Sequence, residues 1–231
     1  MKILLFGSNG QLGKNLTEDI NKKHTLIKCS RKDLNLEELD KIQKYIESIN
    51  PDLIINAAAY TKVDEAELNA ELSFTINSRA VENMALAALK KNIFLIHFST
   101  DYVFDGLKDS AYSENDEAKP LNVYGRSKLQ GELKIQTLLS KFIILRVSWI
   151  ISNSGTNFIK KILNLSSKNS SIKVVDDQFG SPTSTSLISK VTHEIIESIN
   201  IMRPWSSGIY HLSAKGSVSW FFVAKKIMEM A

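Results

Sequence analysis

Short runs of wholly apolar residues alternate with longer amphipathic stretches along this chain, and this alternation limits the possible folds more than any other feature. Strands that are buried on both faces read as continuous apolar runs, because helices cover both sides of a parallel sheet. Such strands are joined by crossover helices rather than by hairpins. The sequence therefore predicts a parallel sheet with strands at Ile3 to Phe6, Thr25 to Lys28, Leu53 to Asn56, Phe94 to Phe98 and Ile143 to Val147.

Amphipathic periodicity predicts helices between these strands. Apolar side chains recur three and four residues apart from residue 39 to residue 49, with Asn35 as the expected cap and Pro51 as the expected stop. The segment 66–91 is predicted to be one long helix, and 127–139 another. The chain therefore reads as an α/β protein.

Three glycines, Gly7, Gly10 and Gly13, follow the first predicted strand at equal spacing. Glycine lets the backbone turn tightly and approach a pyrophosphate, whose charge the amides and dipole at the start of the next helix can hold. The alternative is a glycine-rich turn that binds nothing. The order of strand, turn and helix favours a dinucleotide site.

The end of the second predicted strand is basic. NAD-selective sites place a carboxylate there, whereas this chain carries Arg31 within a run of basic and polar residues from 28 to 32. A phosphate on the cofactor ribose would suit this charge, so NADP is the expected cofactor and NAD is left open. A solvated basic loop is the alternative reading.

The pattern becomes less regular after Trp149. A loop at 152–155 should lead to a short helix, a strand at 172–175, a helix at 187–199, a strand at 209–212 and an apolar helix running into Ala231. We expect a dinucleotide-binding domain of the Rossmann type, a doubly wound parallel sheet, at 1–150. Residues 151–231 should form a smaller and incomplete substrate-binding region of a truncated chain.

Charge and cysteine content restrict the partners. The 29 Lys and Arg residues against 25 Asp and Glu leave a net charge of +4, which is too thinly spread for a nucleic-acid-binding stripe. The single cysteine, Cys29, cannot form an internal disulfide, and no apolar stretch is long enough for a signal peptide or a membrane helix. We expect a cytoplasmic protein without nucleic-acid or membrane partners.

Tyr124 and Lys128 stand four residues apart at the entrance of a predicted helix, and hence on one face. A nearby ammonium favours a phenolate, so Lys128 is expected to bring the pKa of Tyr124 toward the working range of a proton relay. Such a spacing also arises by chance. Thr100 ends a buried strand at the edge where open parallel sheets bind ligands, although it could simply cap that strand.

Several segments together carry a resemblance to a known family. They are 7–13, 56–59, 63–67, 99–104, 121–128, 146–149 and 177–183, which include Ser99-Thr100-Asp101-Tyr102-Val103-Phe104 and Tyr124-Gly125-Arg126-Ser127-Lys128. The chain resembles the extended short-chain dehydrogenase/reductases and, more narrowly, the dTDP-4-dehydrorhamnose reductase family. The resemblance covers essentially the whole chain, and the joint order of the segments is highly specific.

The resemblance implies hydride transfer from a nicotinamide cofactor to the ketone at carbon four of a dTDP-linked keto-sugar. Tyr124 would be the catalytic acid, Lys128 would hold the nicotinamide ribose, and Thr100 would contact the sugar. With Arg31 added from the charge argument, the expected cofactor-binding residues are Gly7, Gly10, Gln11, Leu12, Gly13, Arg31, Asn35, Leu36, Ala59, Tyr60, Thr61, Phe98, Tyr124 and Lys128. The expected substrate-binding residues are Asp64, Thr100, Asp101 and Trp149.

The chain also departs from the family. Members often carry Asp where Asn35 stands, and members that assemble through magnesium carry Glu where this chain has Asn15. We expect no metal site and no metal-bridged dimer, while a homodimer of another kind stays open.

Two other functions compete. A related dehydratase would need an acid at Tyr102, and a related epimerase would retain a tightly held NAD. A non-catalytic homologue, like the regulatory subunit of methionine adenosyltransferase, is disfavoured because Thr100, Tyr124 and Lys128 are all present. The acidic residues at 64, 65 and 67 could also merely face solvent.

Overall fold

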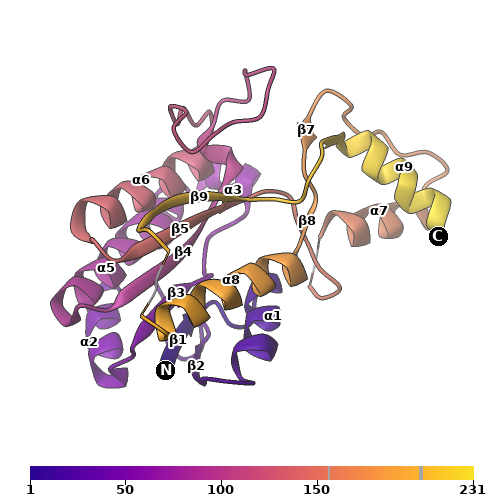
Figure 1. The fold of residues 1–231 in the computed structure, drawn as a ribbon. Coiled ribbons are helices and arrows are strands. Elements are labelled where there is room, and N and C mark those ends of the chain that lie inside the picture. Colours follow the sequence, from indigo (N-terminus) through magenta and orange to yellow (C-terminus); the bar gives the residue numbers. More distant parts are fainter. Residues whose placement is uncertain (156, 203–204) are drawn as a thin grey trace.

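The computed structural model describes residues 1–155, 157–202 and 205–231. At its centre is a six-stranded sheet in the order β2-β1-β3-β4-β5-β9, in which all neighbouring strands run parallel (Figure 1). The strands are β1 (Lys2–Phe6), β2 (Thr25–Cys29), β3 (Leu53–Asn56), β4 (Phe94–Thr100), β5 (Phe142–Val147) and β9 (Gly208–Leu212). The predicted parallel sheet is confirmed, including its strand near residue 209.

Helices cover both faces of this sheet. On one face lie α1 (Gln11–Ile20) and α8 (Thr185–Asn200), and on the other lie α2 (Leu39–Ile49), α5 (Ala80–Lys91) and α6 (Val123–Leu138). Ile3 and Leu5 of β1 pack against the first pair, whereas Leu4 and Phe6 pack against the second group. This alternation of buried side chains explains the apolar runs and confirms the doubly wound α/β fold.

The long helix predicted over 66–91 is interrupted. It consists of α3 (Val63–Leu68), α4 (Ala70–Phe74), a π-helical turn η1 (Thr75–Arg79) and α5. Asn69 leaves the helical conformation at φ −124° and ψ 47°. At η1 the Asn77 carbonyl lies so close to Gly131 of α6 that a Cβ on that glycine would come within 2.2 Å of it. The segment is helical, as its composition predicts. Its π-helical turn lies where it packs closely against α6, a contact that the composition does not reveal.

Helix α2 has the predicted bounds but not the predicted cap, and α6 begins earlier than predicted. Asn35 accepts the Glu37 N–H at 3.3 Å, and the side chain that precedes α2, Glu38, forms no cap. Helix α6 begins at Val123 rather than at residue 127, because Asn122 accepts the Gly125 N–H at 2.7 Å and caps it. Tyr124 therefore lies in the first turn of α6.

The remaining elements form what we call the second lobe, beside the carboxyl edge of the sheet (Figure 1). They are β6 (Ile150–Ile151), α7 (Phe158–Ser166), β7 (Phe179–Gly180), β8 (Thr183–Ser184), β10 (Val218–Ser219) and α9 (Trp220–Met230). The segment 151–231 is not confined to this lobe, because the chain returns to the main sheet with α8 and β9.

The prediction of a strand at 172–175 is wrong. These residues alternate between half-buried and exposed, as a strand would, but they form no part of a ladder. The Val175 carbonyl accepts the Phe221 N–H at 3.0 Å and thus ties the segment to α9. A strand needs a neighbour, and the pattern of one segment does not supply it.

No helix within the described ranges is both long enough and apolar enough to cross a lipid bilayer.

Candidate active site

The glycine turn lies at the point where the sheet order reverses. From β1 the chain reaches β2 on one side and β3 on the other, and such a switch point opens a ligand crevice at the carboxyl ends of the strands. Gly7 has φ +78°, and a Cβ on it would lie 2.6 Å from the Ala58 nitrogen, just after β3. A Cβ on Gly13 would lie 2.1 Å from the Gly7 carbonyl oxygen. Side chains are therefore excluded where a pyrophosphate would approach.

The start of α1 fits an anion. Gly10 precedes this helix and no side chain caps it. The first amides of a helix have no partners within the helix, and its dipole favours negative charge there. The turn thus offers the backbone and the field that a dinucleotide pyrophosphate needs.

A loop of the second lobe covers this turn. The Ser152 hydroxyl donates to Gln11 Oε1 at 3.1 Å, and Asn157 Nδ2 lies 3.5 Å from the same oxygen. A Cβ on Gly155, which has φ +74°, would lie 2.9 Å from Gln11 Cγ. The loop was predicted from sequence, but its contact with the glycine turn was not, because the two are about 140 residues apart.

Lys128 lies in a buried polar chain that links three elements. Its amine donates to the Phe98 carbonyl at 2.6 Å and lies 3.2 Å from His97 Nε2. His97 Nδ1 in turn lies 3.0 Å from Asn56 Nδ2, while Asn56 Oδ1 accepts the Ala58 N–H. Strands β3 and β4 thereby hold the Lys128 amine at the carboxyl edge of the sheet.

This chain of contacts favours an uncharged amine. Because the Asn56 oxygen already accepts from Ala58, its NH₂ group donates to His97 Nδ1, and the single proton of the neutral ring sits on Nε2, facing Lys128. Burial lowers the pKa of Lys128 to about 8, and burial together with the charge of Lys128 holds the pKa of His97 well below its usual value. Sequence reasoning missed both His97 and Asn56.

The lowered pKa predicts a pH dependence of stability. Below about pH 8 Lys128 is charged in the folded and unfolded chains, and its burial is unfavourable. Between about pH 8 and pH 10.5 the unfolded chain keeps a proton that the folded chain has lost, so stability rises with pH by up to about 1.4 kcal/mol per unit. The measurement is the difference in unfolding free energy between the wild type and Lys128→Met from pH 7 to pH 10. A difference that does not change with pH would contradict this assignment.

Tyr124 is buried one helical turn before Lys128. Its ring meets the Tyr102 ring edge to face, with centroids 5.6 Å apart, and its hydroxyl bonds to that of Thr100. Burial raises the pKa of Tyr124 above its usual value, the charges of Asp101 and Tyr102 raise it further, and only the Thr100 hydrogen bond lowers it. The prediction that Lys128 lowers this pKa is wrong, because the lysine amine is directed to Phe98 and His97. The phenol keeps its proton, as an acid must.

Thr100 and Asp101 lie beside this phenol. The Thr100 hydroxyl donates to Asp101 Oδ1 at 3.0 Å, and Asp101 Oδ2 accepts the Ser148 hydroxyl at 2.9 Å. Burial raises the pKa of Asp101, and these two hydrogen bonds oppose the rise. The structure therefore brings together Thr100, Asp101 and Tyr124, while Lys128 lies one helical turn further along α6 with its amine on β4.

Asn77, in the π turn, positions the segment after β3. Its side chain accepts the Tyr60 N–H at 2.9 Å and donates to the Tyr60 carbonyl at 3.0 Å. It also donates to Ser127 Oγ of α6 at 3.0 Å. One buried amide thus aligns the predicted cofactor-binding segment, residues 59–61, with the helix that carries Tyr124. Its only signal in the sequence is a polar residue inside an apolar helix.

The acidic residues of α3 differ in their roles. Glu67 accepts the Val123 N–H at 2.7 Å and so helps to hold the first turn of α6. Asp64 is exposed, although its charge contributes to a raised pKa of Tyr102. All three acidic residues, at 64, 65 and 67, are exposed, so the solvent-facing reading holds for their positions, but Glu67 also contacts the helix of the site.

The basic residues after β2 are more exposed than Thr100, Tyr124 and Lys128. The Arg31 guanidinium is 76% exposed and pairs with Glu37 at 2.5 Å. Leu36 is buried in the core of the α2 face rather than open to the crevice. A carboxylate that sequence reasoning overlooked, Asp33, accepts the N–H and the hydroxyl of Ser30 at 2.8 and 2.6 Å. These bonds lower the pKa of Asp33 and occupy it in the turn.

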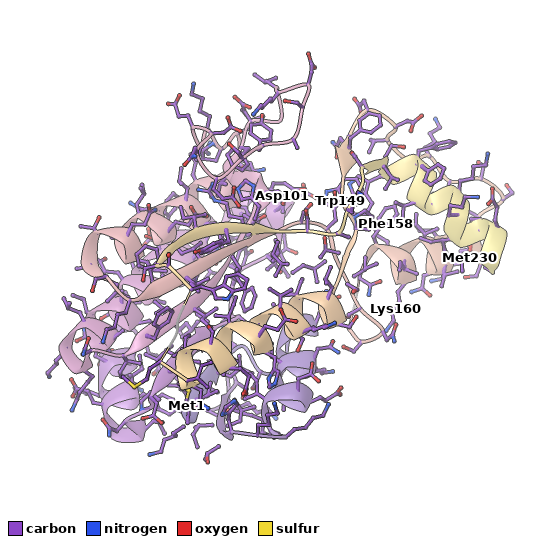
Figure 2. All side chains as sticks on the ribbon, in the orientation of Figure 1. Met1, Asp101, Trp149, Phe158, Lys160 and Met230 are labelled. Atoms are coloured by element: carbon purple, nitrogen blue, oxygen red, sulfur yellow. The ribbon has the colours of Figure 1, made fainter. Side chains whose placement is uncertain are left out.

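Trp149 joins the sheet to the second lobe. It has φ +41°, and its indole stacks on that of Trp220 with ring centroids 3.5 Å apart. A Cβ on Gly180 would lie 2.4 Å from the Trp149 ring, so glycine is required there. Figure 2 labels Asp101 at the edge of the sheet, with Trp149 and Phe158 following it toward the second lobe.

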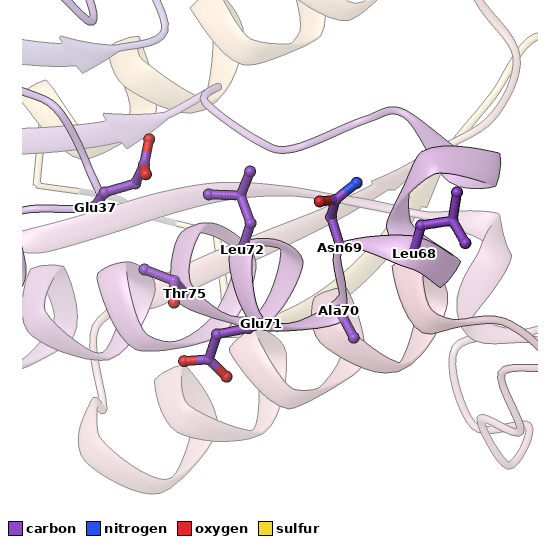
Figure 3. Close-up of a pocket in the computed structure, with 7 residues that line it drawn as sticks. All are labelled: Glu37, Leu68, Asn69, Ala70, Glu71, Leu72 and Thr75. Atoms are coloured by element: carbon purple, nitrogen blue, oxygen red, sulfur yellow. The ribbon is translucent and has the colours of Figure 1, made fainter.

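Two hollows lie away from these residues. One of about 490 Å³ runs beside α4 and is lined by Glu37, Leu68, Asn69, Ala70, Glu71, Leu72 and Thr75 (Figure 3). A second, of about 470 Å³, lies between α4, α5 and α6. Neither is lined by Thr100, Tyr124 or Lys128, so the candidate site is defined by its polar groups and not by these two hollows.

Comparisons with known proteins give a consistent result. Residues 1–231 match the family described as the RmlD substrate binding domain. The chain is 40% identical to dTDP-4-dehydrorhamnose reductase of Aggregatibacter actinomycetemcomitans over 232 residues, which cover 100% of this chain and 79% of that protein.

Solved structures agree. The crystal structure of a dTDP-4-dehydrorhamnose reductase from Clostridium acetobutylicum matches with a TM-score of 0.93 at 35% identity, over 100% of this chain and 80% of that one. A dTDP-4-dehydrorhamnose reductase from Bacillus anthracis, in complex with NADP, matches with a TM-score of 0.91 at 37% identity, over 99% and 80%.

Proposed function

Because the chain belongs to the dTDP-4-dehydrorhamnose reductase family, we propose that it reduces the 4-keto group of dTDP-4-dehydro-L-rhamnose, with NADPH as the hydride donor and Tyr124 as the proton donor. The observation that carries this proposal is the convergence of Thr100, Tyr124 and Lys128 at the carboxyl edge of the sheet. The comparisons confirm, at the level of the family, the resemblance seen in the sequence.

The glycine turn is suited to hold the cofactor. Its backbone leaves no room for a Cβ at Gly7 or Gly13, and the uncapped start of α1 faces the place of the pyrophosphate. Lys128 would bind the nicotinamide ribose, and Ala59 to Thr61 would flank the cofactor after β3. Bound NADPH would supply a hydride to the carbonyl carbon.

The residues of the chain provide the proton and its control. Since burial raises the pKa of Tyr124, its hydroxyl is protonated at neutral pH and can donate to the oxygen that becomes an alkoxide. The Thr100 hydroxyl, already bonded to that phenol, can also reach the same oxygen and hold the sugar in place. Lys128 is mostly in its ammonium form at neutral pH, and its amine donates to the Phe98 carbonyl, so it would serve to hold the cofactor rather than to change the pKa of Tyr124.

The test is NADPH oxidation with a panel of nucleotide-linked keto-sugars. We expect turnover with dTDP-4-dehydro-L-rhamnose and formation of dTDP-L-rhamnose, which mass spectrometry identifies. A chain that binds NADPH but oxidises it with no member of the panel would contradict the proposal and favour a non-catalytic homologue. Full occupancy by copurified NAD would favour an epimerase instead.

Cofactor choice gives a separate prediction. If Arg31 contacts the 2′-phosphate, NADPH binds more tightly than NADH, and Arg31→Gln weakens NADPH binding by roughly tenfold without changing NADH binding. Glu37→Gln should strengthen NADPH binding, because it releases Arg31 from its ion pair. Fluorescence titration of both cofactors measures this.

The control is Lys91→Gln, at an exposed cation near the amino edge of the sheet. It should leave both dissociation constants unchanged. Equal affinities of the wild type for NADPH and NADH would remove the preference.

A further inference from the structure

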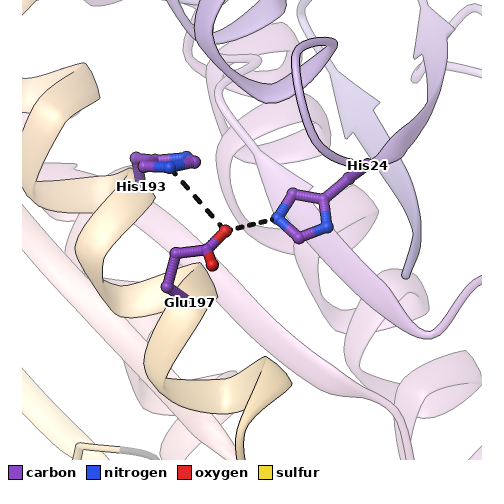
Figure 4. A group of neighbouring side chains, drawn as sticks. All are labelled: His24, His193 and Glu197. Carbon is purple, nitrogen blue, oxygen red and sulfur yellow. Dashed lines mark hydrogen bonds and ion pairs between the residues drawn. The ribbon is translucent and has the colours of Figure 1, made fainter.

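Two histidines and a glutamate meet where the α1–β2 connection contacts α8 (Figure 4). His24 Nε2 lies 2.9 Å from Glu197 Oε1, and His193 Nε2 lies 3.7 Å from the same oxygen. His193 and Glu197 are one turn apart on α8, whereas His24 is 173 residues from Glu197 in sequence. One ligand atom from each residue lies within 4.8 Å of the others.

This cluster is more than an ordinary surface ion pair. The His24 side chain is only 3% exposed, and His193 and Glu197 are 24% and 33% exposed. His193 Nδ1 is buried and has no hydrogen-bond partner among the described residues. Neither imidazole has a carboxylate of its own, since both face one Glu197 oxygen. The fold therefore brings two imidazoles, one from the α1–β2 connection and one from α8, to one carboxylate of α8.

Two imidazole nitrogens and one carboxylate oxygen are a donor set for a first-row transition ion. Imidazole suits Zn²⁺, Ni²⁺ and Cu²⁺ far better than Mg²⁺ or Ca²⁺, which prefer oxygen ligands. Ligand distances near 2.0–2.2 Å from a central ion require only small side-chain movements from the observed positions. We propose that His24, His193 and Glu197 form a binding site for Zn²⁺ or a similar transition ion, with water completing its coordination.

Local charge sets the strength of this site. Lys23 Nζ lies 3.8 Å from Glu197 Oε2, so a cation at the cluster competes with this lysine. Lys23 is 58% exposed and can move into solvent. Asp19, held by the Ser189 hydroxyl at 2.6 Å, adds negative charge from α1 near His193.

The proposed ion would act on stability and not on the chemistry. Helix α8 covers the sheet face opposite to α6, the helix of Tyr124 and Lys128. The ion would fasten the connection after α1 to α8, two segments that come from the beginning and the end of the chain. Because the ion binds the folded state alone, it should raise the unfolding temperature.

Calorimetric titration of the metal-stripped full chain with ZnCl₂ tests the proposal. We expect one Zn²⁺ per chain, and an increase of roughly 5 °C in unfolding temperature at a hundredfold excess over the dissociation constant. Glu197→Gln and His193→Gln should each weaken binding by at least about tenfold, because each removes one ligand.

The matched control is Glu194→Gln. It removes the same charge from the same helix, at an exposed position outside the cluster. Zn²⁺ affinity should be unchanged in this variant. The proposal is overturned if the wild type binds no Zn²⁺, or if Glu194→Gln weakens binding as much as Glu197→Gln does. Because the readouts are binding and unfolding, they are independent of the proposed reductase activity.

Discussion

Replacing Tyr124 with phenylalanine is expected to lower turnover of the keto-sugar by about 10²–10⁴-fold, while the dissociation constant of NADPH changes little. The change removes the only proton that the buried ring offers to the forming alkoxide, and leaves the glycine turn and Lys128 in place. The phenyl ring keeps the edge-to-face contact with Tyr102. Steady-state kinetics and a binding titration on the same preparation separate the two effects.

Tyr102→Phe is the natural control for this experiment. Tyr102 contacts the Tyr124 ring, but it is 39% exposed and on a different element, the short turn η2 (Asp101–Val103). We expect Tyr102→Phe, which also removes one phenolic hydroxyl, to lower turnover far less than Tyr124→Phe does. If Tyr124→Phe turns over at the wild-type rate, the proton comes from another group, and Thr100 or a water becomes the donor to test.

Glu132→Ala is expected to destabilise the fold by about 3–5 kcal/mol. Glu132 of α6 is fully buried and accepts from Arg146 of β5, with Nη2 at 2.6 Å and Nε at 3.0 Å. The guanidinium is 5% exposed and lies 5.0 Å over the Phe104 ring, while its Nη1 has no partner among the described residues. Without the carboxylate, the guanidinium stays buried without its hydrogen-bonded partner, and Glu114 acts on it only through charge. Urea unfolding measures the loss.

The comparison is with a more exposed ion pair that joins the same helix to α5. Lys134 pairs with Glu82 at 2.8 Å, but both side chains are about one-third exposed. Lys134→Ala should therefore cost less than about 1 kcal/mol. Glu132→Gln keeps the volume and some hydrogen bonds, so its loss should fall between the two. Equal unfolding midpoints for Glu132→Ala and Lys134→Ala would show that burial does not set the strength of this pair.

The main sheet was predictable because burial on both faces leaves a direct trace in the sequence. Leu53 to Asn56 is wholly buried, as its apolar run implies. The glycine turn was equally accessible, since only glycine tolerates the approach of Ala58 to Gly7. The apolar run and the glycine spacing each lie within one short segment, so each can be recognised without knowing which distant residues contact it.

Features that depend on distant partners were not predictable. The π turn at 75–79 exists because α6 packs there, and nothing in its own composition requires it. The segment 172–175 has the pattern of a strand but no neighbour to pair with. Likewise, Glu67 accepts the Val123 N–H in the first turn of α6, and these two residues are 56 positions apart in the sequence.

The pKa of Tyr124 was mispredicted for a physical reason. A lysine four residues away on a helix can lie near a phenol, but its amine goes where the strongest acceptors are. Here the Phe98 carbonyl takes it, and burial of the phenol outweighs any charge effect. Helical spacing gives a shared face and does not give the direction of a long flexible side chain.

The stacked indoles of Trp149 and Trp220 give the protein a built-in optical reporter. The planes of the two rings make an angle of 5°. Trp149 follows strand β5, and Trp220 is the first residue of α9. Two chromophores stacked face to face at this separation couple strongly, which should produce a paired band in near-ultraviolet circular dichroism and quench their emission. Any displacement of α9 relative to the end of β5 would separate the rings, so their emission would report it without any attached dye.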